Sequence, residues 1–219
     1  MFHLIKKDIL MQKKTIGLSL LFILFFAFTL SEIGPSGLVV NILAVTYMLV
    51  LGASAVEDKN NSDIMLVSLP IKKSTIVFSK YMSVYFFAFY AVFINFLIYL
   101  IVNQFNLSIK VLPFTSDALF FSIIAVTLFC SITLPLIFKY GFLKSRVISI
   151  ILFFVFISGG LSLVDNLSKN ENSIFSQKIV NLLNTSSDIQ IAVLISIPVV
   201  IVLFISYILS LNFYKNREF

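Results

Sequence analysis

Charge is scarce in this sequence. Charged residues make up 12% of the 219 residues, whereas 59% are hydrophobic, and a soluble domain carries about twice that charged fraction. A soluble fold of this length has too little interior to bury so much apolar surface. The mean hydropathy of +1.05 therefore predicts an integral membrane protein.

The residues and motifs on which many catalytic sites depend are also missing. Cys130 is the one cysteine, so no intrachain disulfide can form, and we interpret it as a small core residue. His3 is the one histidine, which excludes a histidine metal site and leaves a Ser–His relay without a supporting G-x-S-x-G motif. No G-x-x-x-x-G-K-[ST] loop is present to hold ATP phosphates. We therefore expect no enzyme activity and no cofactor or metal in this chain, and any work on a substrate needs energy from another subunit.

What the sequence does contain is a series of long apolar runs without charge. A helix needs about 20 apolar residues to cross a bilayer, and continuous rather than alternating runs exclude a strand barrel. No run has a charge near its centre, which argues against an ion-coupled carrier. We predict an all-α polytopic membrane protein that forms a single domain over residues 1–219. Its six membrane-spanning helices are expected at about 15–31, 37–56, 81–102, 118–138, 147–164 and 190–211.

The basic residues between these runs predict the orientation of the chain. With the N-terminus inside, 13 of the 16 Lys and Arg residues fall in inside segments. The other three, Lys110, Lys169 and Lys178, fall outside. We therefore predict that both termini and the segments 57–80 and 139–146 are cytoplasmic. The net charge of +6 follows from this orientation and gives no reason to expect a nucleic-acid partner.

Two segments beside the predicted spans have the pattern of amphipathic helices. Residues 1–14 have a basic face and an apolar face formed by Phe2, Ile5 and Ile9. This pattern favours an interfacial helix on the inner leaflet, and a plain extension of the first span is the alternative. The outer segment 165–188 starts polar and then shows an apolar helical face, which predicts one or two short helices on the outer leaflet.

The stretch 54–83, SAVEDKNNSDIMLVSLPIKKSTIVFSKYMS, joins the second and third predicted spans. It carries seven of the 26 charged residues and an apolar patch at 64–67, which a plain tether does not need. We predict a short helix over about 62–68, stopped by Pro70, and a following helix capped by Ser74. An apolar tip with a charged rim is typical of a protein-docking surface, and a segment that lies on the lipid interface is the alternative.

This stretch resembles the corresponding loop of small bacterial ABC-2-type permeases. In that family an acidic residue ends the second span, a short segment with SLP and basic residues follows, and SKY leads into the third span. The matching residues here are Glu57, Ser68-Leu69-Pro70, Lys72-Lys73 and Ser79-Lys80-Tyr81. The basic N-terminal helix, the six spans and the long outer segment also match, so the resemblance covers the whole chain, although only the loop is specific.

The resemblance implies a type V exporter in a bacterial plasma membrane. Two such permease subunits, identical or different, would pair with two separate ABC ATPase subunits, which bind ATP and Mg. The segment 57–73 would be the coupling helix seated in a groove of the ATPase. The residues that it would contribute to coupling are Glu57, Asp58, Asp63, Ile64, Met65, Leu66, Leu69, Pro70, Lys72 and Lys73. The expected substrates are amphipathic or hydrophobic peptides, and a motorless immunity protein or an exporter of lipid or polysaccharide precursors are the alternatives.

Overall fold

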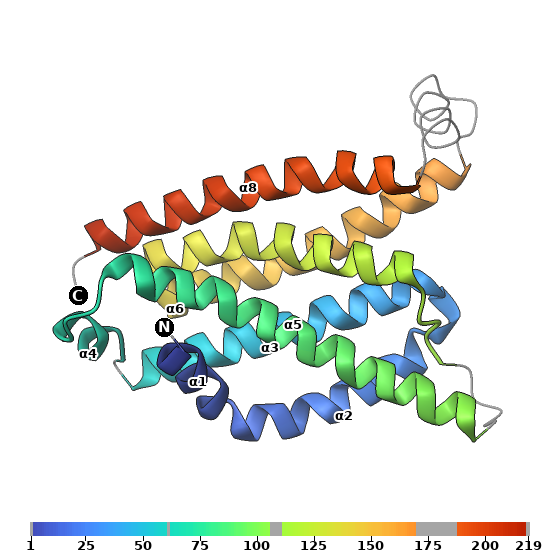
Figure 1. Ribbon diagram of the computed structural model, residues 1–219, viewed down its shortest axis with the longest axis horizontal. Coiled ribbons are helices and arrows are strands. Elements are labelled where there is room, and N and C mark those ends of the chain that lie inside the picture. Colours follow the sequence, from blue (N-terminus) through green and yellow to red (C-terminus); the bar gives the residue numbers. More distant parts are fainter. Residues whose placement is uncertain (1, 61, 106–110, 170–187, 218–219) are drawn as a thin grey trace.

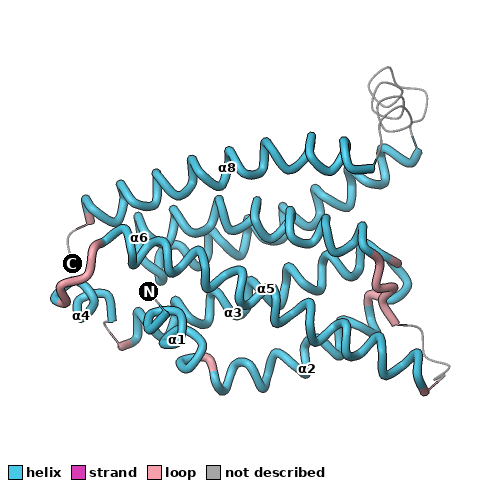
Figure 2. Tube along the Cα trace, in the orientation of Figure 1, coloured by secondary structure: helices cyan, strands magenta, loops and turns pink. Residues whose placement is uncertain are grey.

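The computed structural model describes residues 2–60, 62–105, 111–169 and 188–217. Over these residues the regular structure is entirely helical (Figure 2), which confirms the predicted all-α class. The helices are α1 (Phe2–Met11), α2 (Lys13–Thr29), the short 3-10 helix η1 (Ser31–Ile33), α3 (Pro35–Lys59), α4 (Ser62–Ser68), α5 (Lys73–Gln104), α6 (Ser116–Lys169) and α8 (Asp188–Asn216). The outer helices predicted within 165–188 fall largely on residues 170–187, outside the described part of the chain.

The long helices run side by side along the long axis of an elongated bundle (Figure 1). One end of this bundle carries α1, α4 and both chain termini, and we call it the α4 end. Much of the outer surface is apolar: Phe25, Phe89, Phe154 and Phe204, on four different helices, are 59%, 69%, 66% and 62% exposed. Such a surface is stable in contact with lipid rather than water.

Four helices, α3, α5, α6 and α8, are long and apolar enough to cross a membrane, and there are five if the bent pair of α1 and α2 counts as one span. The sequence predicts six spans because it treats residues 118–138 and 147–164 as separate helices. In the structure both ranges belong to α6, which is 54 residues long. Its backbone leaves the helical conformation at Gly141, where φ is 76° and ψ is 171°, and the chain reverses its direction there (Figure 1).

Helix α3 lies at the centre of the packing, in contact with α2, α5 and α6. Its buried face includes Leu38, Ile42 and Leu49, which are each at most 1% exposed. Polar side chains add specific links between the helices. The Asn41 side-chain amide of α3 donates a hydrogen bond of 2.9 Å to Asn95 Oδ1 of α5, both residues being buried. Such bonds between helices are a common use of polar residues inside membrane proteins.

Candidate coupling site at the α4 end

Helix α4 lies where the sequence predicts a short helix between the second and third spans. It ends at Ser68, whose hydroxyl donates to the Met65 carbonyl oxygen at 2.8 Å, and Pro70 follows. Helix α5 then starts at Lys73, after Lys72, with no side-chain cap. The prediction that Ser74 caps this helix is therefore wrong. Ser74 is already the second helical residue, so its hydroxyl lies too far into the helix to accept hydrogen bonds from the free amide groups of the first turn.

The apolar residues of α4 face in two directions. Met65 is 71% exposed, and Leu69 just after the helix is 46% exposed, whereas Leu66 is only 7% exposed and packs in the core of the bundle. A helix of two turns that lies against the bundle has to turn one side inward. Leu66 is therefore not part of the exposed tip that the sequence predicts, and Met65 with Leu69 forms that tip. Asp63 and Ile64 belong to α4, but their side chains lie outside the described residues.

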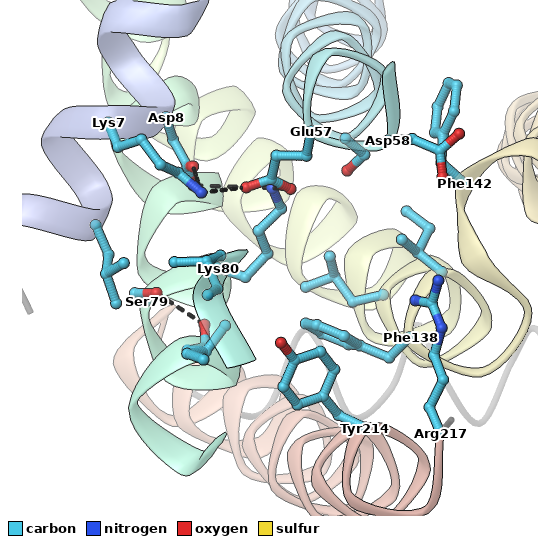
Figure 3. Close-up of a pocket in the computed structure, with 16 residues that line it drawn as sticks. Lys7, Asp8, Glu57, Asp58, Ser79, Lys80, Phe138, Phe142, Tyr214 and Arg217 are labelled. Atoms are coloured by element: carbon cyan, nitrogen blue, oxygen red, sulfur yellow. Dashed lines mark hydrogen bonds and ion pairs between the residues drawn. The ribbon is translucent and has the colours of Figure 1, made fainter. Parts of the chain in front are cut away.

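Beside α4, four charged side chains from three helices form a compact cluster, which we call the ion-pair cluster (Figure 3). Lys7 Nζ of α1 lies 2.7 Å from Glu57 Oε1 in the last turn of α3, and Lys80 Nζ of α5 contacts the other oxygen, Oε2. Asp8 of α1 completes the cluster: its oxygens lie 3.5 Å from Lys7 Nζ and 3.9 Å from Lys80 Nζ. The cluster therefore links α1, α3 and α5 at the point where α4 leaves α3.

The cluster balances two acids against two bases in a largely buried position. Asp8 is 3% exposed and Lys80 is 9% exposed, so their charges are stable there only when paired. The Ser83 hydroxyl of α5 also donates to Asp8 Oδ2 at 2.8 Å. Asp8 lies in α1, before the first predicted span, so its carboxyl is outside the predicted membrane-spanning segments. Burial raises the pKa of its carboxyl above the usual value, and the positive charge of Lys80 opposes this rise.

A cavity of about 40 Å³ separates this cluster from the apolar packing of α4, α6 and α8. Leu66, Phe138 and Tyr214 line its apolar side, and Arg217 lies at its edge (Figure 3). This volume has room for a few water molecules but not for a transported solute. The cavity is therefore a gap in the packing between the cluster and the helices that carry Leu66 and Tyr214.

Comparison with known proteins decides the class of the chain. The sequence model of the ABC-2 family of transporter proteins matches residues 3–215. The chain belongs to the ABC-2 family. No curated protein and no solved structure matches it. This ABC-2 protein is therefore a multi-pass membrane transport subunit, and membership of the family implies that it works with an ABC ATPase partner.

In this ABC-2 protein the residues predicted for coupling fall into separate groups. Glu57 belongs to the ion-pair cluster and Asp58 lines the cavity, so both lie against the bundle. Pro70 and Lys72 are exposed beyond the end of α4. Lys73 Nζ donates to the carbonyl oxygen of Lys215 at 3.2 Å, which ties the start of α5 to the end of α8.

Sequence reasoning did not include Lys7, Asp8 or Lys80 among the coupling residues of this ABC-2 protein, although Lys80 belongs to the matching SKY motif. It treated the N-terminal helix as an element on the membrane surface. The structure packs α1 against α5 and α3, with Ile5 and Asp8 buried. One signal was available: Asp8 is the single acidic residue among the first 14 residues, in a segment that is otherwise basic.

Proposed function

We propose that the chain is the permease subunit of an ATP-driven exporter of amphipathic or hydrophobic peptides in a bacterial plasma membrane. Two permease subunits work with two ATPase subunits, which bind ATP and Mg. Six spans cross the membrane: α2, α3, α5, the two arms of α6 on either side of Gly141, and α8. The reversal of α6 at Gly141 supports this count.

The α4 end faces the cytoplasm in this proposal. It holds both termini, α4 and the reversal of α6. The 13 basic residues that the sequence assigns to the inside lie in these segments or directly beside them. A strong excess of Lys and Arg in short segments at one membrane face is typical of the cytoplasmic side.

Helix α4 is the coupling helix, and the observation that carries this role is its two-sided surface. On the outer side Met65 and Leu69 are exposed apolar residues at the tip, suited to a pocket of the ATPase. On the inner side Leu66 is buried in the bundle, next to the cavity that Glu57 and Lys80 also line. When ATP closes the ATPase pair, the movement reaches α4 at Met65 and passes through the contacts of α4 with α3. The ion-pair cluster then links α3 to α1 and α5.

The peptide class of substrate rests on the resemblance to small bacterial ABC-2-type permeases, a group that includes peptide exporters, and the match of residues 54–83 does not by itself choose this class. An exporter of lipid or polysaccharide precursors shares the same coupling arrangement, so export assays have to separate the two. An assay on cells that carry the permease and its ATPase compares efflux of a labelled amphipathic peptide with efflux of a labelled lipid-linked precursor. Peptide efflux that depends on both subunits supports the proposal, and efflux of the precursor alone contradicts the peptide class.

The docking role is tested by co-purification of the tagged permease with the candidate ATPase from the same genome. Met65→Asp places a charge at the tip, and we expect it to release the ATPase or uncouple ATP hydrolysis from transport. Leu143→Asp is the matched control, because Leu143 is also 71% exposed and lies beside the reversal of α6. Retention of the ATPase by the control and its loss from Met65→Asp is the expected result. If Met65→Asp leaves association, hydrolysis and export unchanged, α4 is not the coupling helix.

A further inference from the structure

A second, much larger cavity lies toward the end of the bundle opposite α4. Its volume is about 580 Å³, within the range of ligand pockets. Three helical segments line it: the first turns of α3, the first turns of α6, and the returning arm of α6 near its end. Among the described residues, neither the ion-pair cluster nor α4 lines it, so this cavity is separate from the coupling site.

The cavity is apolar along its length. Val39 and Leu43 of α3 are four residues apart, and Phe121 and Leu128 of α6 are seven apart, so each pair lies on one face of its helix. Phe156 of the returning arm lines the cavity and packs against Phe129, with ring centroids 5.6 Å apart. Phe129 in turn meets Tyr47, one helical turn beyond Leu43, at 5.0 Å. This aromatic cluster lies on the side of the cavity that faces the α4 end.

The other end of the cavity is polar. Ser36, Thr115 and Asp117 line it, and all three lie at the start of a helix. Asp117 is exposed and is the one charged residue among the described residues of the lining. The full negative charge of this carboxylate is larger than the partial positive charge of the α6 N-terminus beside it, so the entrance attracts a cation. The cavity thus combines an apolar interior with an acidic entrance.

We propose that this cavity binds a single-chain amphiphile with a cationic head. The alkyl chain lies between α3 and the two arms of α6, and the head lies at the entrance beside Asp117. Under the proposed orientation this entrance is at the outer face, so the site holds an amphiphilic substrate before its release. That role rests on the proposed export function, whereas binding to the isolated permease does not depend on it.

Two neighbouring glycines allow a matched test of the cavity. Gly160 lines the cavity, and Gly159 does not. A Cβ atom added at either position meets nothing within 4 Å, so neither backbone position itself excludes a side chain. Gly160→Phe fills part of the cavity, whereas Gly159→Phe adds the same side chain to the same helical turn without filling it.

The test uses the full-length permease in phosphatidylcholine vesicles without an ATPase. The probe is dodecyltrimethylammonium with a photoreactive diazirine on its chain, and labelled peptides are identified by mass spectrometry. We expect saturable labelling in α3 and α6 that Gly160→Phe weakens about tenfold, because its ring takes the place of about two methylenes of the chain. Gly159→Phe should retain the labelling. Asp117→Asn should weaken labelling by about two- to fivefold, since the carboxylate is exposed to water.

Three results overturn the proposal. Equal labelling of the Gly160→Phe and Gly159→Phe proteins means that the probe reports bulk lipid rather than a site. Stronger labelling by the matching dodecyl sulfate probe means that the entrance does not select a cation. Conversion of a dimer to a monomer by Gly160→Phe, measured by mass photometry, means that a second copy of the chain fills the cavity. Intact probe binding together with failed peptide export contradicts the proposed function and leaves the amphiphile site standing.

Discussion

At Glu57 one carboxylate is shared by two lysines that arrive from different helices. Lys7 comes from α1 and Lys80 from α5, while Glu57 itself lies in the last turn of α3. A buried ion pair adds little net stability when complete, but the loss of one partner leaves uncompensated charge in a region of low dielectric constant. The value of the cluster is therefore positional: it fixes the relative placement of three helices next to α4.

Glu57→Gln tests this residue-scale role. Removal of one partner from a buried pair costs about 3–5 kcal/mol, and we expect a loss near the lower limit, because the Lys7 side chain keeps 28% exposure. The measurement is chemical denaturation of the purified protein in detergent. Asp58→Asn is the control, since Asp58 is the next residue and forms no ion pair within the described part of the chain. Equal loss of stability in both variants contradicts a specific role of the cluster.

At the scale of elements, sequence patterns predict where a helix lies better than they predict which of its faces is buried. Pro70 and the apolar patch at 64–67 are local signals, and they place a helix where the structure has α4. The inward position of Leu66 depends instead on the packing of the bundle next to it, which no local pattern contains. The packing of α1 against α5 has the same origin: an amphipathic segment can face lipid headgroups or a neighbouring helix, and only the tertiary structure decides between them.

The two apolar residues of α4 therefore differ in what they stabilise. Leu66→Ala should lower the free energy of unfolding by about 2–5 kcal/mol, because Leu66 is 7% exposed and its loss opens a cavity. Met65→Ala should change it by less than about 0.5 kcal/mol, because Met65 is 71% exposed, yet it should weaken binding of the ATPase. Denaturation curves and co-purification of the two variants give both quantities. Equal destabilisation by the two substitutions contradicts the two-sided orientation of α4.

The reversal inside α6 depends on one residue. Gly141 has a φ of 76° and a ψ of 171°, a conformation that essentially only glycine adopts and in which a side chain costs about 1–3 kcal/mol. Gly141→Ala should therefore lower thermal stability, and the Arg217 guanidinium, 3.1 Å from the added Cβ, also has to move. Gly17→Ala is the matched control: Gly17 lies within α2 with open space around it, and alanine there should raise stability by about 0.5–1 kcal/mol. Unchanged stability of Gly141→Ala contradicts the need for glycine at this reversal.

At the scale of the whole molecule, the proposed topology agrees both with the distribution of basic residues and with the direction in which each helix runs. Six crossings return the chain to its starting side, which is consistent with both termini lying at the α4 end (Figure 1). The one native cysteine, Cys130, is buried, so it should contribute little background when single cysteines are introduced as accessibility probes. Phe142 is a poor probe position because it is 8% exposed, whereas the neighbouring Leu143 is 71% exposed.

Single cysteines at Asn60 and Leu143 should react with a membrane-impermeant maleimide only after the cytoplasmic face has been opened. A cysteine at Gln104, which is exposed at the far end of α5, should react in intact cells, as should cysteines at positions 108 and 172 in the predicted outer segments. The physical reason is that the Lys and Arg residues around α4 keep that end on the cytoplasmic side during insertion. Reaction at Asn60 in intact cells reverses the orientation. It would place α4 outside, where no ATPase can reach it, and Met65 would then have no coupling role.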